Sequence, residues 1–185
     1  MDALKQLLAD EALEFGDFTL ASGAKSTYYL DCRRITLHPM GANLIGEAML
    51  EKIESRSPAI AAVGGMAIGA DPITAAIITI AGQRPESSIA AKLRGFMVRK
   101  EPKGHGKGRQ VEGPVQAGQR VVIVEDVITS GGSALKACVA AREYGLEVAG
   151  VIGIIDRLAG GAEAFAEEGV KMETLFSVRD FGIDA

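Results

Sequence analysis

The sequence predicts an α/β fold, with a central, mostly parallel sheet flanked by helices on both faces. Short apolar runs alternate along the chain with helical segments of about ten residues, which is the spacing of βαβ units. Glycine supplies 23 of the 185 residues, whereas aromatic residues make up only 5% and tryptophan is absent. This composition favours many tight turns between strands and helices, and 48% hydrophobic residues can fill one well-packed core.

Each element is predicted from the spacing of its apolar residues. Helices have them three and four positions apart, and strands are short apolar runs bounded by glycine or polar residues. Asp71-Pro72 has the form of an N-cap followed by proline at the first helical position, and Gly145 stands where a helix end needs a left-handed residue. In chain order we expect an opening helix that reaches Leu13, a hairpin within 18–37, a helix over 39–54, a strand at 60–63 that ends in Gly64-Gly65, a helix over 72–81, strands at 88–92 and 96–99, a strand at 121–124, a helix over 134–144, a strand at 148–156, a helix over 162–168 and a strand at 171–178.

Residues 121–134, VVIVEDVITSGGSA, contain the strongest functional signal in the chain. An apolar strand is followed by two adjacent carboxylates, Glu125 and Asp126, and then by a turn rich in hydroxyls and glycine that opens into a helix. Such a turn directs backbone N–H groups and hydroxyls at one point, with the helix dipole behind them, which is how proteins hold a phosphate monoester. The carboxylates would repel that phosphate and instead suit sugar hydroxyls, a magnesium shell or a developing cation. The pattern indicates a site for a phosphorylated ribose.

Other nucleotide-binding motifs are missing from the sequence. It has neither G-x-x-x-x-G-K-[ST] nor a G-x-G-x-x-G after a strand, so neither a P-loop nor a dinucleotide-binding fold is supported. An ordinary strand–loop–helix unit with a polar turn is the remaining alternative for 121–134. The segment closely resembles the motif with which type I phosphoribosyltransferases bind 5-phosphoribosyl 1-pyrophosphate (PRPP).

A second informative segment, RKEPKGHGKGRQVEG at 99–113, is predicted to be a mobile, exposed loop. Val111 is the one residue that could anchor it, and glycines interrupt it repeatedly. Departing pyrophosphate needs cations that arrive when chemistry starts and leave with the product, which a glycine-hinged basic loop can supply. A solvated loop whose charges serve solubility is the alternative. Its basic residues are Arg99, Lys100, Lys103, His105, Lys107 and Arg109.

Charge and cysteine content argue against several other classes of function. The net charge is −4, with 24 acidic and 20 basic residues, which disfavours broad nucleic-acid or membrane binding. Cys32 and Cys138 have no metal-binding or C-x-x-C spacing, which predicts buried or free thiols in a reducing compartment. The amino terminus lacks the features of a signal peptide, and no apolar run reaches the length of about eighteen residues that a membrane span needs. We expect a cytoplasmic protein without nucleic-acid or membrane partners.

Three candidate site segments stand at the ends of predicted strands. They are Gly64-Gly65-Met66, Glu125-Asp126 and Asp156-Arg157. In open parallel sheets ligands bind outside the carboxyl ends of the strands. The sequence therefore predicts that these segments meet in one active cleft.

Together, FMVRKEPKGHGKG and VVIVEDVITSGGSA resemble the orotate phosphoribosyltransferases, the pyrimidine-synthesis branch of the type I class. Three further segments are similar to that family: FTLASGAKSTYYLD at 18–31, VGGMAIGADPIT at 63–74 and IIDRLAGG at 154–161. The resemblance implies Mg²⁺-dependent condensation of orotate with PRPP to give orotidine 5′-monophosphate and pyrophosphate. The Mg²⁺ would be held mainly through PRPP and water, with no direct protein ligand.

The resemblance also implies an arrangement of the chain. It implies a homodimer in which the loop 100–113 reaches the neighbouring site. It further implies one phosphoribosyltransferase domain over 1–185, in which approximately 1–37 and C-terminal elements contribute a hood over the base pocket.

Roles are carried over from the resemblance residue by residue. Arg157 also makes chemical sense by itself, because a guanidinium can pair with the carboxylate of orotate or stack on its ring. A surface ion pair is the alternative for Arg157, as a solvated loop lysine is for Lys25. Orotate would contact Thr129, Arg157 and Lys25. The catalytic residues would be Lys100, Lys103, His105 and Asp126. PRPP would be bound by Arg99, Lys100, Lys103, His105, Glu125, Asp126, Val127, Ile128, Thr129, Ser130, Gly131, Gly132 and Ser133.

Two rival functions are compatible with part of this pattern. A purine or uracil phosphoribosyltransferase would share 121–134 but not the RKEPKGHG loop. It would also usually build its base pocket from the end of the chain, where only LFSVRDFGIDA remains. A PRPP-sensing regulator would need an added nucleic-acid surface, against which the acidic balance argues.

Overall fold

The centre of the molecule is a six-stranded sheet with the strand order β5-β4-β3-β6-β7-β8. The computed structural model describes residues 1–19, 25–88, 90–101 and 109–184. Every neighbouring pair in this sheet is parallel except β4 and β5, which are antiparallel at one edge. The predicted mostly parallel sheet is therefore confirmed. Its strands are β3 (Ala62–Met66), β4 (Arg94–Val98), β5 (Val111–Glu112), β6 (Arg120–Ile128), β7 (Glu147–Asp156) and β8 (Met172–Ser177).

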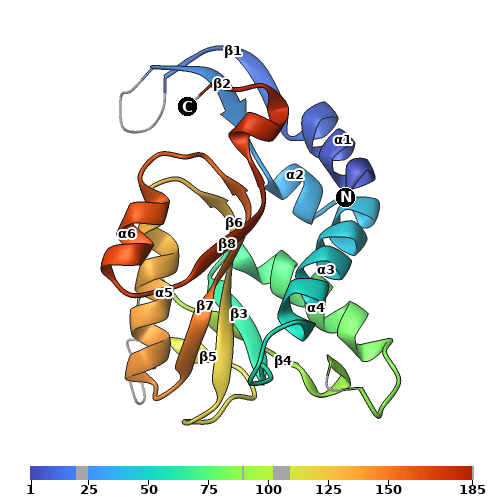
Figure 1. Cartoon of the computed structure of the whole chain (residues 1–185), viewed down its shortest axis with the longest axis vertical. Coiled ribbons are helices and arrows are strands. Elements are labelled where there is room, and N and C mark those ends of the chain that lie inside the picture. The colour runs from blue at the N-terminus through green and yellow to red at the C-terminus, as the bar shows by residue number, and fades with distance from the viewer. Residues whose placement is uncertain (20–24, 89, 102–108, 185) are drawn as a thin grey trace.

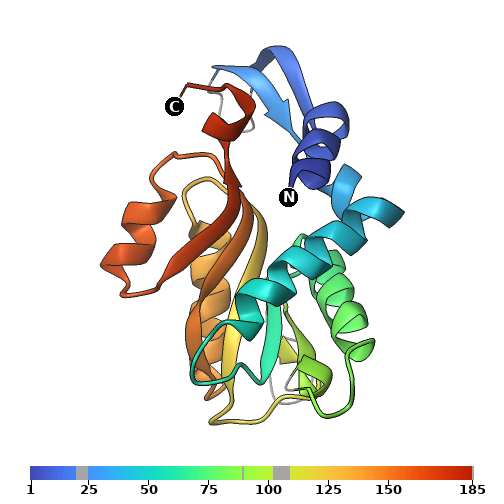
Figure 2. The same ribbon diagram turned by 45° about the vertical axis from the view of Figure 1, so that its right-hand side comes forward.

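Helices cover both faces of the sheet (Figures 1 and 2). On one face lie α3 (Pro39–Glu54) and α4 (Ala70–Gly82), and on the other lie α5 (Gly132–Glu143) and α6 (Gly161–Glu167). Alternate residues of β6 enter different cores: Val122 and Val124 pack on the α3 side, whereas Val121 and Ile123 pack on the α5 side. Burial on both faces explains why β6 reads in the sequence as an unbroken apolar run.

A hairpin lies beyond the carboxyl ends of the central strands, at the top of Figure 1. It consists of β1 (Leu13–Thr19) and β2 (Lys25–Leu30), which pair antiparallel as a separate sheet. The short helix α2 (Arg33–Thr36) leads from it to α3, and the C-terminal turn η2 (Val178–Phe181) lies beside it in both ribbon views. The opening helix α1 (Asp2–Glu11) buries Leu4 and Leu8 in the core on the α3 side.

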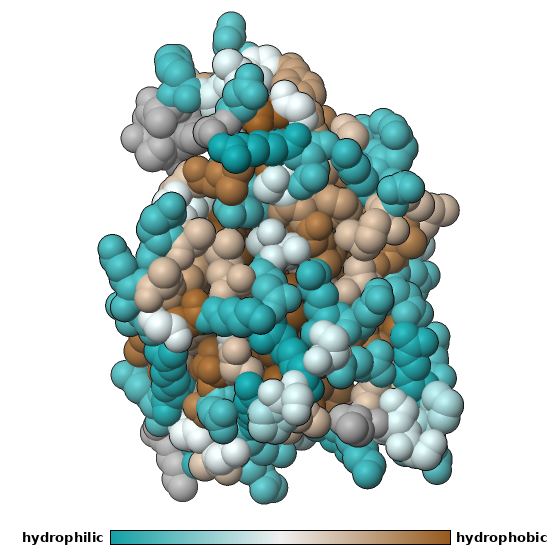
Figure 3. All heavy atoms as spheres, in the orientation of Figure 1, coloured by the Kyte–Doolittle hydropathy of each residue, from teal (hydrophilic) through white to brown (hydrophobic). Residues whose placement is uncertain are grey.

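The surface in the orientation of Figure 1 is largely hydrophilic. Figure 3 shows hydrophobic side chains in separate patches, one of them on the side where α2 and α3 lie. Among the described residues, no helix has both the length and the apolar character needed to cross a bilayer.

Two local predictions in the middle of the chain are wrong. Helix α4 begins at Ala70 with Gly69 as its N-cap, so Asp71 and Pro72 lie inside its first turn. Proline is tolerated there because first-turn N–H groups have no partner within the helix. The predicted strand 88–92 is instead a turn followed by the 3₁₀ helix η1 (Ala90–Lys92) in its described part. The Ala90 N–H donates to Ser88 Oγ over 3.1 Å, a local bond that favours a turn over a ladder.

Several predicted boundaries also shift. The opening helix ends at Glu11, because Leu13 pairs with Leu30 across the hairpin, and the hairpin ends before α2. Strand β4 starts at Arg94 rather than at 96, and α5 starts at Gly132 rather than at 134. β3 runs through its glycines to Met66, and β6 continues beyond its carboxylates. Pairing with a neighbour extended these strands through residues that are not hydrophobic.

Candidate active site

A cleft of about 360 Å³ opens at the carboxyl ends of β3, β6 and β7. The three segments expected to meet there contribute Met66, Glu125 with Asp126, and Arg157, so the predicted convergence is confirmed. Two further stretches join them, the turn after β3 and the segment that follows β2. The cleft is lined by Leu30, Asp31, Cys32, Arg33, Met66, Ala67, Ile68, Gly69, Lys100, Glu125, Asp126, Val127, Thr129, Ser133 and Arg157.

The turn between β6 and α5 has the form of an anion cradle. Gly131 is the N-cap of α5 with a φ of 76°, and none of the described side chains caps this helix. The first N–H groups of α5 therefore point outward beside the exposed hydroxyls of Thr129 and Ser133. Gly131 is required by space as well as by φ, since a Cβ there would lie 2.9 Å from Phe165 Cε2. Phe165 on α6 is fully buried and supports the turn from beneath.

The two carboxylates at the end of β6 differ in environment. Glu125 is buried, with 7% of its surface exposed, and its Oε2 has no hydrogen-bond partner among the described residues. Burial and the negative charge of Asp126 raise the pKa of Glu125 to about 8. Asp126 is half-buried, and its Oδ1 accepts a hydrogen bond of 2.8 Å from the Val127 N–H. A buried oxygen without a partner is costly, so a ligand hydroxyl in the cleft would stabilise this arrangement.

The turn after β3 approaches these carboxylates closely. A Cβ at Gly65 would lie 2.3 Å from the Val124 carbonyl oxygen and 2.6 Å from Ala70 Cβ. Only glycine at this position lets β3, β6 and the start of α4 come so near one another. A Cβ at Gly69 would lie 3.4 Å from Asp126 Oδ1, which shows how close this turn passes to the carboxylate.

Arg157 stands at the end of β7 with its charge available to a ligand. Its backbone N–H donates to the Ile128 carbonyl over 2.8 Å, which fixes its Cα beside the cradle. Its Nε donates to the Tyr28 hydroxyl over 2.9 Å, and its Cζ lies 4.6 Å from the centre of the Tyr28 ring. The described residues give this guanidinium no carboxylate partner, so the surface ion pair considered for it is not found.

The basic residues of 99–113 do not all lie at the cleft. Lys100 lines the cleft, whereas Arg99 lies outside it, with Nη1 3.8 Å from Glu112 Oε1. Lys103 and His105 lie outside the described residues. The prediction of an exposed loop is wrong at its far end, because Val111 pairs with Val98 of β4 and is buried. Arg109 lies over the Tyr144 ring, with Cζ 5.7 Å from its centre.

Several of the predicted PRPP contacts do not line the cleft with their side chains. Ile128 is buried in the core on the α5 side, and Gly131 and Gly132 would take part through their backbone. Ser130 is exposed on the same turn. Lys25 lies on β2 outside the cleft lining, and its Nζ donates to Thr19 Oγ1 over 2.8 Å. The assigned roles of these residues stay predictions.

Sequence reasoning missed the contribution of the segment after β2. Asp31 and Arg33 both line the cleft, and Arg33 Nε donates to Asp31 Oδ1 over 2.7 Å and Nη2 to Oδ2 over 2.9 Å. The Arg33 guanidinium lowers the pKa of Asp31. Sequence reasoning also missed Tyr28, which contacts Arg157. A charged pair directly after a strand was the available signal for Asp31 and Arg33.

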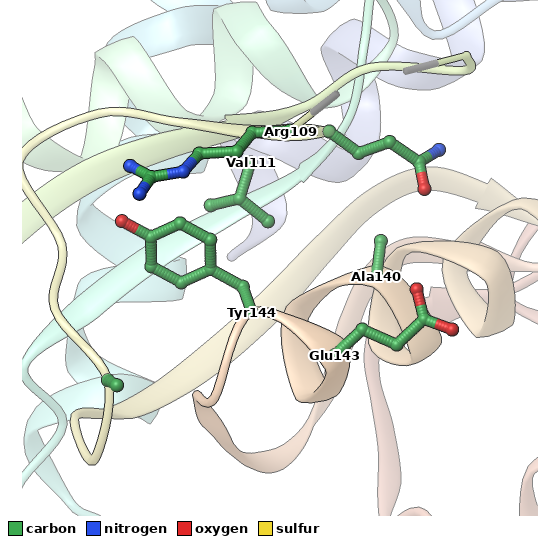
Figure 4. A pocket seen from close by; sticks show the side chains of 7 residues that line it. Arg109, Val111, Ala140, Glu143 and Tyr144 are labelled. Carbon is green, nitrogen blue, oxygen red and sulfur yellow. The ribbon is translucent and has the colours of Figure 1, made fainter. Parts of the chain in front are cut away.

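A larger cavity of about 450 Å³ lies elsewhere on the molecule. Figure 4 shows this cavity between two sets of side chains. Arg109 and Val111 lie on one side, and Ala140, Glu143 and Tyr144, from the C-terminal end of α5, lie on the other. This end of α5 is near the amino end of β6, since the Gly118 N–H donates to the Gly145 carbonyl over 2.8 Å. It therefore lies away from the strand ends where ligands bind in such sheets. Among the residues that the structure describes, no group of three or more metal-binding side chains lies close enough to hold a metal ion.

Comparison with known proteins gives one consistent result. A model of the phosphoribosyl transferase domain matches residues 39–173. The chain is 63% identical to the orotate phosphoribosyltransferase of Rhodopirellula baltica, covering 96% of the chain and 92% of the relative, and 44% identical to that of Aquifex aeolicus, covering 97% and 96%. Its structure is similar to that of Mycobacterium tuberculosis orotate phosphoribosyltransferase in complex with Fe(III) dicitrate, with a TM-score of 0.82, 39% identity and 98% of each chain covered. A structure of the M. tuberculosis enzyme in complex with PRPP has a TM-score of 0.79 and 35% identity, again with 98% of each chain covered.

The raised pKa of Glu125 predicts a pH dependence of stability without ligand. A carboxyl with a usual pKa of 4.5 and a folded value of about 8 binds more protons in the folded state between these values. The contribution of Glu125 to the free energy of unfolding should therefore be highest below pH 4.5. It should fall as the pH rises to 8, by at most about 1.4 kcal/mol per pH unit.

Urea unfolding of Glu125→Gln across this range checks the effect. The variant should lose this part of the decline and exceed the wild type in stability at pH 8. Asp126→Asn should make the decline end at a lower pH, because loss of the negative neighbour lowers the pKa of Glu125 in the folded state. If wild type and Glu125→Gln change in parallel with pH, Glu125 titrates normally and its described environment is wrong.

Proposed function

The chain belongs to the orotate phosphoribosyltransferases, and we propose that it acts in the cleft at the carboxyl ends of β3, β6 and β7. It is a pentosyltransferase that moves the 5-phosphoribosyl group from PRPP to orotate, giving orotidine 5′-monophosphate and pyrophosphate in pyrimidine biosynthesis. One observation carries the assignment of the site. A single cleft holds the rim of an anion cradle, a pair of carboxylates and an arginine without a carboxylate partner among the described residues.

PRPP fits the cleft with its charged ends on different elements. Its 5-phosphate would lie on the turn 129–133, where the N–H groups of α5 and the hydroxyls of Thr129 and Ser133 converge. The ribose hydroxyls would pair with Glu125 and Asp126 at the end of β6. The buried, unpartnered Oε2 of Glu125 supports this placement, because a hydroxyl is the partner that a buried carboxyl oxygen lacks.

The pyrophosphate end of PRPP would lie towards Lys100 on the cleft wall. Arg99, Lys103 and His105 would complete its positive surroundings when the loop closes. Mg²⁺ would offset charge on the pyrophosphate as it leaves. The carboxylates of Glu125 and Asp126 in the cleft are oxygen donors of the kind that suits such an ion, and they would contact it through water and PRPP oxygens.

The reaction needs little proton transfer from the protein. The ring nitrogen of orotate is already acidic and would lose its proton to water. The nitrogen then bonds to ribose C1 as the bond from C1 to pyrophosphate breaks and pyrophosphate leaves. Positive charge develops on the ribose in this step, and Asp126 stands beside it with a carboxylate. Thr129 and Arg157 would hold orotate, the arginine through the orotate carboxylate. Only the family resemblance supports a contact between Lys25 and orotate.

We propose a homodimer in which the loop 100–113 serves the neighbouring site. An apolar groove of about 400 Å³ between α2, α3 and α4 gives a surface for a second copy. Leu37 lines this groove and is 72% exposed. Met40, the second residue of α3, is 58% exposed, and Ile68, which lines the cleft, is 75% exposed. A second copy that covered both the groove and Ile68 would border the cleft, which is the geometry that loop exchange needs.

The remaining organisation is proposed on the same family basis. Residues 1–185 would form one domain, with approximately 1–37 and the C-terminal elements as a hood over the base pocket. A cytoplasmic location is supported by Cys32 and Cys138, which are both free and buried.

The substrate assignment predicts a sharp preference among bases. With PRPP and Mg²⁺, orotate should be consumed efficiently, while uracil, adenine and hypoxanthine should not, because none of them offers a carboxylate to Arg157. Removal of the divalent metal with a chelator should abolish turnover. Base consumption followed by absorbance checks both points. Faster use of uracil or of a purine than of orotate would contradict the assignment and leave only the broader phosphoribosyltransferase class.

The exchange of loops predicts complementation between two inactive variants. Lys103→Ala and Asp126→Asn should each be nearly inactive as homodimers. After mixed refolding, about half of the dimers are mixed, and each mixed dimer pairs one intact cleft with an intact loop from its neighbour. Activity should return to about a quarter of the wild-type value, since one site in four is then complete.

The control is a native mass spectrum that shows the mixed dimers. If they form and the mixture stays as inactive as its parents, the loop acts within its own subunit. If no dimer of any kind forms, the proposed apolar interface is wrong.

A further inference from the structure

One contact joins the hairpin to the end of β7. The Tyr28 hydroxyl on β2 accepts a hydrogen bond from Arg157 Nε over 2.9 Å, across 129 positions of sequence. The Arg157 guanidinium also lies near the face of the Tyr28 ring, with Cζ 4.6 Å from the ring centre. Tyr28 itself is half-buried, and its body packs against the core on the α3 side. A partly buried side chain of the hairpin therefore contacts the charged side chain at the end of β7 that lines the cleft.

Apart from its contacts with Tyr28, the hydrogen bonds at Arg157 and at the turn that follows fix only the backbone. Its N–H is fixed by the Ile128 carbonyl, and the turn after it is fixed by a hydrogen bond of 2.8 Å from the Leu158 N–H to Asp156 Oδ1. Beyond Cα, arginine has four rotatable bonds, and ordering them has an entropic cost. The described residues provide no carboxylate to do this. Tyr28 provides both a hydrogen bond and a ring face instead.

The contact uses the part of the guanidinium that carboxylate binding does not need. Tyr28 takes the N–H of Nε, which leaves the four N–H donors on Nη1 and Nη2. These two terminal nitrogens can form a two-pronged contact with a carboxylate. The ring beneath one face of the guanidinium also limits its rotation out of the cleft.

We propose that Tyr28 is a positioning residue for orotate: it orients Arg157 so that both terminal nitrogens meet the carboxylate of the base. This inference rests on the proposed contact between Arg157 and orotate. Tyr28 itself does not line the cleft, so it acts through Arg157 and not by touching the substrate. PRPP is proposed to bind to other elements, and its binding should not depend on this contact.

Steady-state kinetics of Tyr28→Phe test the role. The variant keeps the packed ring and loses only the hydroxyl, so its thermal stability should stay close to that of the wild type. The KM for orotate should rise by about fivefold or more, while kcat and the KM for PRPP change less than about twofold. Tyr28→Leu, which loses the ring as well, should raise the KM for orotate further. Tyr29→Phe is the matched control, because Tyr29 lies one position along β2, contacts Phe18 instead, and should leave both KM values unchanged.

A double-mutant cycle tests the role of Tyr28 separately from the proposed contact between Arg157 and orotate. The dissociation constant of orotidine 5′-monophosphate, measured by calorimetry, can be compared for wild type, Tyr28→Phe, Arg157→Ala and the double variant. Tyr28→Phe should weaken binding of orotidine 5′-monophosphate when Arg157 is present. It should have no further effect in the Arg157→Ala background. An equal loss in both backgrounds, or no loss in either KM or binding, would overturn the positioning role of Tyr28. If Arg157→Ala alone binds the product as tightly as the wild type, Arg157 does not hold the base and that part of the proposed function fails.

Discussion

The position of the site follows from how β6 pairs with its two neighbours. β6 pairs with β7 over a longer stretch than with β3. The β3–β6 ladder ends at Gly64 and Ile123, whereas the β6–β7 ladder continues to Ile128 and Asp156. The last residues of β6 are therefore held on the β7 side and open on the β3 side, where the turn after β3 and the cleft lie. Because β7 stays paired to its end, Arg157 is fixed beside the turn that leads into α5. A shift of one residue in this register would exchange the faces of the sheet to which Glu125 and Asp126 point.

Opposite electrostatic demands are met within one short segment by a change of secondary structure. At the end of β6 the side chains of Glu125 and Asp126 provide carboxyl oxygens. Burial and the negative charge of Asp126 raise the pKa of Glu125 to about 8. A few residues later the chain offers backbone N–H groups at the start of α5, where negative charge is favoured. A ligand that carries both hydroxyls and a phosphate monoester can bridge these environments. A simple dianion, or a sugar without phosphate, could satisfy only one of them.

The sequence predicted the central sheet, the helices on both faces and the meeting of three strand ends, because buried parallel strands leave continuous apolar runs and their carboxyl ends share one edge. It could not predict that β6 would continue through Glu125 and Asp126, since that depends on pairing with β7. It also could not assign Tyr28, whose contact with Arg157 spans two distant parts of the chain. The antiparallel strand β5 was missed because two residues give no periodicity, although the burial of Val111 depends on it.

Binding of PRPP in this cleft requires that the start of α5 holds the phosphate of the sugar. Titration of the ¹⁵N-labelled protein with ribose 5-phosphate, followed through backbone amide shifts, measures this most directly. We expect the largest changes at the amides of residues 130–134, with smaller ones near Glu125 and Asp126. The cavity between Arg109 and Tyr144 should remain unchanged. Large shifts at that cavity, together with unchanged amides at the start of α5, would contradict the account.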